Sequence, residues 1–177
     1  MEARPRSRVD GPTGRRRPWA AGEGFAVATG GYGGAMEAAS KGAAEAGGQV
    51  IGVTCDRIEH WRGVRPNRWI GQEIRCRTLR QRLFRLIEIG QALIALPGGV
   101  GSLLEVALAW SLLQTQEIWP RPLVVVGKAW RRTLTAFSET ADGYLLAEDA
   151  ALVSFAADGA AAARLVVRGL GRGSFPG

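Results

Sequence analysis

Residues 97–105 read PGGVGSLLE and separate two apolar segments of different character. The segment before them, Ala92–Leu96, is short and wholly apolar, whereas Val106–Leu113 after them has apolar residues at helical spacing. This order is typical of a buried strand that passes through a glycine turn into a helix. The stretch therefore predicts an α/β fold in which a parallel strand ends at the turn.

The turn itself has two interpretations. Gly98, Gly99 and Gly101 lack a Cβ, so their N–H groups can come close to a ligand, and the positive end of the helix dipole favours an anion there. Alternatively, Ser102 and Glu105 have the spacing of a capping box, in which both side chains satisfy free N–H groups at the start of the helix. Spacing alone leaves a phosphate site and a capped helix equally open.

A second glycine loop favours the phosphate site. Residues 29–34, TGGYGG, follow a short apolar strand at Phe25–Ala28 and precede a predicted helix at Ala35–Ala46. The next apolar strand is Gln49–Thr54, and the order strand, helix, strand implies a right-handed crossover between parallel strands. In such sheets ligands bind beyond the carboxyl ends of the strands, where both glycine loops are expected to lie.

Composition and charge bound the class of protein. With 177 residues and 46% hydrophobic content, the chain is expected to form one globular domain over residues 19–171. Of the net charge of +7, residues 1–17 carry +4, from six arginines against two acidic residues. We interpret residues 1–18 as a disordered basic tail that does not bind nucleic acid, and residues 172–177 as a flexible tail. The start lacks a secretory signal and no apolar run could span a bilayer, so a cytoplasmic location is expected.

The other elements follow from apolar periodicity. Residues 55–71 lose the pattern and are predicted to form a long loop, whose arginines and tryptophans suit a subunit interface or pocket wall better than a nucleic-acid surface. Thr78–Ile89 predicts an amphipathic helix with Arg82 at the boundary between its faces, where it is either solvated or aimed at a ligand. The remaining predicted elements are strands at 122–127 and 152–156 and helices at 130–140 and 159–170.

The inventory of reactive residues narrows the chemistry. His60 is the sole histidine and lies in the irregular segment, and no cluster of metal ligands is apparent, so no metal site is expected. Cys55 and Cys76 lack the spacing of a zinc site and are interpreted as reduced thiols. A phosphate cradle, a carboxylate and arginines remain as the chemically useful groups.

These motifs carry a family resemblance. Residues 97–105 resemble the PGGxGTxxE signature of the LOG (LONELY GUY) family, which is often labelled lysine-decarboxylase-like, and Thr29–Met36 resembles that family's GGGxxGxM motif. Aligned backward from Pro97 without a gap, Arg82 falls on the arginine of the family's arginine-lysine pair. The resemblance runs from about Phe25 to Leu113.

The resemblance implies a single three-layer Rossmann-like domain with a mostly parallel sheet, a homodimer, and no cofactor. It implies hydrolysis of a nucleoside 5′-monophosphate, such as a cytokinin riboside 5′-monophosphate or AMP, to free base and ribose 5-phosphate. Arg82 and Glu105 would be catalytic, because a carboxylate can stabilise the positive charge that builds on the ribose and orient water. The implied substrate-binding residues are Thr29, Gly30, Gly31, Gly34, Met36, Gly98, Gly99, Gly101 and Ser102.

The chain departs from the family pattern in several places. Ser102 stands for threonine and keeps the hydroxyl, whereas Thr29 replaces the first glycine and Leu83 replaces the lysine after the arginine. The family's usual first strand and helix have no counterpart before residue 19. Because that strand is usually central, we expect its loss to leave unpaired backbone groups or to force repacking.

An alternative function stays open on the same residues. A non-catalytic nucleotide or cofactor carrier, similar to the molybdenum-cofactor carrier proteins, would need the glycine loops but not Arg82 and Glu105 facing one ligand. The decarboxylase label fits poorly, because a pyridoxal enzyme needs a Schiff-base lysine in a cofactor site, and Lys41 and Lys128 have no such setting.

Overall fold

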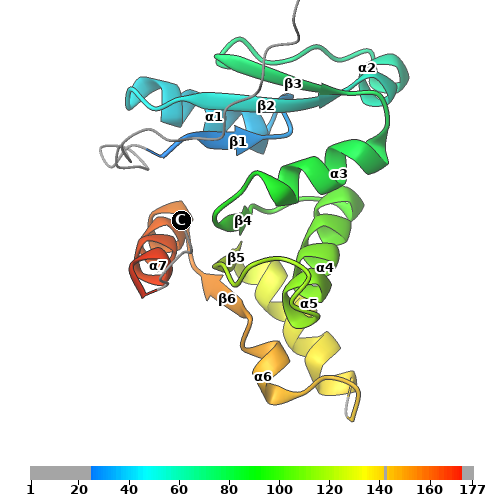
Figure 1. The fold of residues 1–177 in the computed structure, drawn as a ribbon, viewed down its shortest axis with the longest axis vertical. Helices are drawn as coiled ribbons and strands as arrows, with labels where there is room; N and C mark the ends of the chain where they lie inside the picture. The colour runs from blue at the N-terminus through cyan, green and yellow to red at the C-terminus, as the bar shows by residue number, and fades with distance from the viewer. Residues whose placement is uncertain (1–24, 142, 173–177) are drawn as a thin grey trace, which may run out of the picture.

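The computed structural model describes residues 25–141 and 143–172, so the two predicted tails, apart from Arg172, lie outside the described residues. Helices alternate with parallel strands throughout the described part (Figure 1). The first half contains β1 (Val27–Thr29), α1 (Ala35–Glu45), β2 (Val50–Cys55), α2 (Asp56–Arg62), β3 (Gln72–Cys76) and α3 (Leu79–Glu88). The second half contains β4 (Leu93–Ala95), α4 (Val100–Gln114), β5 (Leu123–Val126), α5 (Lys128–Thr140), α6 (Ala147–Ala150), β6 (Val153–Ala156) and α7 (Gly159–Arg172).

The strands form two parallel sheets of three, with the orders β1-β2-β3 and β4-β5-β6. The predicted α/β class with parallel strands is confirmed, but the single sheet that we expected is divided in two. Among the described residues β1 pairs only with β2, and β4 only with β5. In the described part of the chain, β1 and β4 are therefore each at one edge of their sheet. Figure 1 shows α3 between the two sheets.

The segment predicted as one long loop was assigned wrongly in part. It begins with the helix α2, which ends at Gly63 in the left-handed conformation, and strand β3 follows at Gln72–Cys76. Helix α6, a single turn, was also missed. β3 is a sheet edge with mostly exposed side chains, so its sequence alternates polar and apolar residues weakly and gives little signal.

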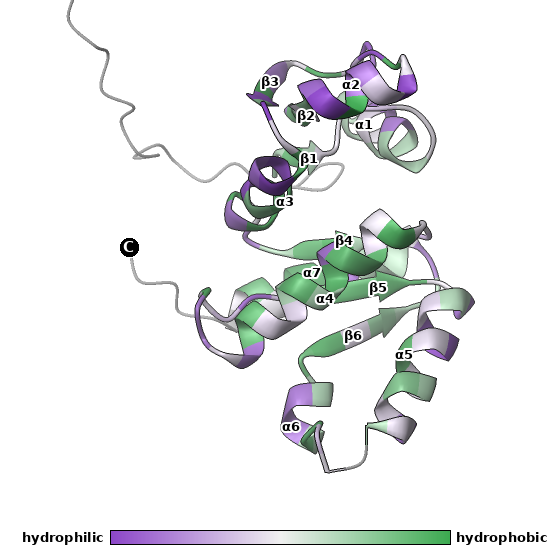
Figure 2. Cartoon of the chain, turned by 90° about the vertical axis from the view of Figure 1, so that its right-hand side faces the viewer, coloured by the Kyte–Doolittle hydropathy of each residue, from purple (hydrophilic) through white to green (hydrophobic). Residues whose placement is uncertain are grey.

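The main hydrophobic core lies around β5 and α4. All four residues of β5 are buried, and α4 buries five apolar residues, among them Trp110 and Leu113, in this core. Figure 2 shows this contrast, with α4, β5 and β6 largely hydrophobic and α2 and α3 strongly hydrophilic on their outer faces. The buried core residues of the larger cluster are Ile87, Val106, Ala109, Trp110, Leu112, Leu113, Leu123, Val125, Trp130, Leu134 and Val153.

Candidate functional site

The first glycine loop follows β1 and is mostly buried. The hydroxyl of Thr29 accepts the N–H of Gly31 at 3.1 Å and lies 3.1 Å from the hydroxyl of Ser40 on α1. Gly31 and Gly34 both have a positive φ, of 82° and 74°, which favours glycine. The N–H of Gly31 is already bonded to the Thr29 hydroxyl, so Thr29 and Gly31 shape the loop and do not offer that N–H to a ligand. Gly34 is exposed at the start of α1 and stays accessible to a ligand.

Arg82 projects from α3 into the space beside this loop. Its side chain is buried, and its Nε donates a hydrogen bond to the carbonyl of Val53 on β2 at 2.9 Å. Nη2 lies 3.9 Å from the sulfur of Met36. An ideal Cβ on Gly30 would lie only 1.7 Å from that nitrogen, so the guanidinium rests directly on the backbone of Gly30. The backbone of Gly30 and the side chain of Met36 therefore pack against the Arg82 guanidinium.

Arg82 faces Glu105 of α4. The distance from Nη1 of Arg82 to Oε1 of Glu105 is 3.5 Å, and the Glu105 side chain is 36% exposed. Burial raises the pKa of the Glu105 carboxyl above its usual range, and the guanidinium of Arg82 opposes that shift without overcoming it. The two residues implied to be catalytic thus come together from different helices, with one carboxylate edge accessible.

The capping-box interpretation of Ser102 and Glu105 is wrong. The residue that caps α4 is Gly99, with no side-chain hydrogen bond from the described residues, and Ser102 lies inside the first turn. A capping box exists instead at the start of α3, where Thr78 and Gln81 bond each other's backbone N–H groups. That box fixes the beginning of the helix that carries Arg82.

The second glycine loop is more open than the first. Gly98, Gly99 and Gly101 are exposed, and no described atom lies within 4 Å of an ideal Cβ on Gly99 or Gly101. At Gly98, by contrast, a Cβ would lie 2.2 Å from the hydroxyl oxygen of Ser102, so the loop folds back over the first turn of α4. Accessible N–H groups at the positive end of a 15-residue helix suit an anionic ligand.

Sequence reasoning missed two parts of this site. The carbonyl of Val53 orients Arg82, and the hydroxyl of Tyr32 bonds the backbone of Cys55. Leu83, at the position of the family's lysine, packs against the main core instead of facing the site. Contacts across 20 or more residues leave no local pattern, so neither Val53 nor Tyr32 could be identified from spacing.

The arrangement combines a carboxylate, a guanidinium and two loops at helix starts. A carboxylate can stabilise a developing positive charge and orient water, and a guanidinium can bind phosphate or a departing anion. No group of three or more His, Cys, Asp and Glu side chains able to hold a metal occurs in the described part of the chain. The carboxylate and the guanidinium can together perform acid-base and electrostatic chemistry.

Comparisons with known proteins agree with this fold. Residues 36–166 match the family model described as "Possible lysine decarboxylase". The molybdenum cofactor binding protein from the phototrophic bacterium Rippkaea orientalis is 23% identical, with a TM-score of 0.61 over 81% of this chain and 77% of that one. The molybdenum cofactor carrier protein from Chlamydomonas reinhardtii is 28% identical, with a TM-score of 0.58 over 84% of this chain and 80% of that one. The predicted Rossmann-like fold is confirmed.

No curated protein matches the chain in sequence. No helix in the described residues is long and apolar enough to cross a membrane.

Proposed function

Because this chain belongs to the family described as possible lysine decarboxylases, the LOG family, we propose that it is a nucleoside 5′-monophosphate phosphoribohydrolase. The observation that carries the proposal is the pairing of Arg82 with Glu105 at 3.5 Å, between the two glycine loops. A phosphate carrier needs the loops alone, whereas a hydrolase also needs a carboxylate beside the reacting sugar.

In the proposed reaction the bond between C1′ of the ribose and the base nitrogen breaks, and water supplies the oxygen at C1′. The carboxylate of Glu105 stabilises the positive charge on the ribose and takes a proton from the attacking water. The base leaves with the bonding electrons and receives a proton. The products are the free base and ribose 5-phosphate.

The remaining site residues bind and orient the substrate in this proposal. The accessible N–H groups of Gly98, Gly99 and Gly101 hold the 5′-phosphate at the start of α4, and the Ser102 hydroxyl adds a donor there. Arg82, fixed by Val53, positions the nucleotide or assists departure of the base. The buried residues Thr29, Gly30 and Gly31 and the partly buried Met36 shape the loop and hold Arg82, while Gly34 is exposed to the ligand.

The family's decarboxylase description finds no support in the lysines. Lys41 is half exposed and pairs with Glu45, and Lys128 is exposed at the start of α5. A lysine that forms a Schiff base needs a site shielded from water, and both of these side chains are exposed. A pyridoxal mechanism is therefore not proposed.

A carrier is the second candidate, because both solved structures compared above bind or carry the molybdenum cofactor. Such a protein would hold an anionic ligand at the glycine loops without cleaving it. A Glu105→Gln variant separates the two candidates. A hydrolase would lose turnover, because it depends on the carboxylate, whereas a carrier would keep its ligand binding.

We also propose that the protein is a homodimer. Three apolar residues at the start of α4, Val100, Leu103 and Leu104, are exposed, at 84%, 43% and 48%. A second copy would cover these side chains. Light scattering is expected to give twice the monomer mass, and Leu104→Glu should shift it towards the monomer; a monomeric wild type would contradict this.

The test of the hydrolase is release of free base from AMP and from an N6-substituted adenosine monophosphate. Glu105→Gln should reduce turnover at least about a hundredfold, a typical loss when an electrostatic group of the transition state is removed, with nucleotide binding retained. The matched control is Glu88→Gln, which removes an exposed carboxylate on α3 that pairs with Arg85. Equal turnover by wild type and Glu105→Gln would refute the role of Glu105, and nucleotide binding without turnover would favour the carrier.

A further inference from the structure

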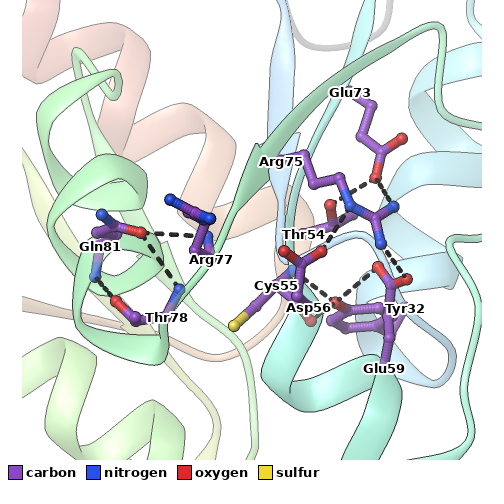
Figure 3. A network of polar contacts seen from close by, with 10 residues as sticks. All are labelled: Tyr32, Thr54, Cys55, Asp56, Glu59, Glu73, Arg75, Arg77, Thr78 and Gln81. Atoms are coloured by element: carbon purple, nitrogen blue, oxygen red, sulfur yellow. Dashed lines mark hydrogen bonds and ion pairs between the residues drawn. The ribbon is translucent and has the colours of Figure 1, made fainter.

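Tyr32 lies in the first glycine loop and is buried, at 5% exposure (Figure 3). Its hydroxyl oxygen accepts the N–H of Cys55 at 2.7 Å. Its hydroxyl hydrogen has two acceptors in range, the carbonyl of Cys55 at 3.1 Å and the carboxylate of Glu59 at 3.3 Å. One phenol group therefore fastens the loop both to the end of β2 and to α2.

The groups around Tyr32 are themselves fixed. Arg75 of β3 donates to Glu59 at 3.1 Å and to Asp56 at 2.6 Å, so the carboxylate beside the phenol is held from the other side (Figure 3). A tyrosine with its ordinary pKa of about 10 is already protonated at neutral pH, and burial, the largest cause, raises the pKa of Tyr32 further, so its hydroxyl is able to donate. The protonated phenol and its ordered partners therefore hold the first glycine loop against β2 and α2.

Tyr32 and its loop also contact Arg82. The Cζ atom of Arg82 lies 5.9 Å from the centroid of the Tyr32 ring, within range of a cation–π contact. Gly30, two residues before Tyr32, supplies the backbone on which the guanidinium rests. Any shift of the loop would thus move two of the surfaces that surround Arg82.

Asn67 fastens the same loop from the segment after α2. Its backbone N–H donates to the carbonyl of Gly31 at 2.8 Å, and its side-chain amide donates to the carbonyl of Tyr32 at 3.2 Å. These bonds hold the backbone of the loop, whereas the Tyr32 hydroxyl holds the side chain that faces Arg82. The two fastenings can therefore be separated by changing the hydroxyl alone.

We propose that Tyr32 is a positioning residue, whose hydroxyl fixes the loop at residues 30–34 and thereby holds the Arg82 guanidinium against Glu105. That this position of Arg82 matters for a bound nucleotide rests on the proposed function. Its structural content, that the hydroxyl sets the position of Arg82, can be measured without turnover.

The test compares Tyr32→Phe with Glu73→Gln. The first variant removes only the hydroxyl and keeps the ring. The second removes a carboxylate of the same network that bonds Thr54 and Arg75 but does not touch Tyr32. Two readouts are measured in each protein, the hydrogen exchange of the amides in residues 30–34 and the titration of the Glu105 side-chain carboxyl by NMR.

Tyr32→Phe should speed exchange of the loop amides about fivefold, the equivalent of one hydrogen bond. It should also raise the pKa of Glu105, because Arg82 is the charge that lowers it and would no longer be held in place. Glu73→Gln should leave both readouts at their wild-type values. In the hydrolase assay the acid side of the kcat/KM profile should move to higher pH in Tyr32→Phe, whereas simple loss of folded protein would lower the rate at every pH.

Unchanged exchange in Tyr32→Phe would overturn the anchoring role of the hydroxyl. Faster exchange with an unchanged Glu105 titration would overturn the link to Arg82. Both readouts are independent of turnover, so failure of the proposed hydrolase function would appear separately, as absence of base release from the wild type.

Discussion

The two glycine loops of this protein have the same motif type but different settings. The loop after β1 is buried over residues 29–32 and bonded internally, through the Thr29 hydroxyl and the Tyr32 phenol. The loop after β4 is exposed over residues 97–101. The difference indicates that the two loops have separate roles. The first loop packs against Arg82, and the second is accessible to an anion. A glycine motif therefore does not by itself specify that its N–H groups contact a ligand.

The largest expected effect is that of Gly30→Ala. The new Cβ would overlap the Arg82 guanidinium, which is buried and cannot move without losing its bond to Val53. We expect a loss of about 3 kcal/mol in the free energy of unfolding, at the upper end for overpacking, and loss of turnover. Denaturant unfolding and the base-release assay measure the two quantities.

Gly99→Ala is the matched change in the second loop. No described atom lies within 4 Å of the added methyl, so stability should change by less than about 0.5 kcal/mol. If the two alanine variants lost similar stability, the contrast between the loops would be wrong.

Thr29→Val is expected to have the next largest effect. It removes the acceptor of the buried Gly31 N–H and a partner of the Ser40 hydroxyl, which should cost about 2 kcal/mol. Thr29→Ser keeps the hydroxyl and should lose much less. Thermal unfolding of both variants gives the comparison, and a loss in Thr29→Ser as large as that in Thr29→Val would contradict the dominant role of the hydroxyl.

The sequence indicated the glycine loops and the parallel strands, because these depend on local periodicity, whereas Arg82 and Glu105 were connected only through the family resemblance. It did not indicate the partners of Thr29 and Tyr32, which lie in β2, α1 and α2. Those contacts join segments that only the tertiary fold brings together. β3 was missed for a related reason, since an exposed edge strand needs few apolar side chains.

The smallest predicted effect is that of Glu105→Gln on the free energy of unfolding, and this change is expected to stabilise the protein. Its folded-state pKa is raised, so the folded protein binds this proton more tightly than the unfolded chain does. The resulting stabilisation is present below the unfolded pKa and is lost as the pH rises through the folded pKa. Glu105→Gln should therefore be slightly more stable than the wild type at pH 7, with the difference vanishing at low pH. Thermal unfolding of both proteins from about pH 4, near the ordinary pKa of glutamate, up to neutral pH checks this. A less stable variant at pH 7 would show that the ion pair with Arg82 outweighs desolvation.

The central claim is that this site breaks an N-glycosidic bond, and product analysis tests it most directly. Wild-type protein incubated with AMP should yield adenine and ribose 5-phosphate in equal amounts, and Gly30→Ala should yield neither, since it displaces Arg82. Recovery of both AMP and an N6-substituted adenosine monophosphate intact from wild-type protein that binds them would contradict the claim.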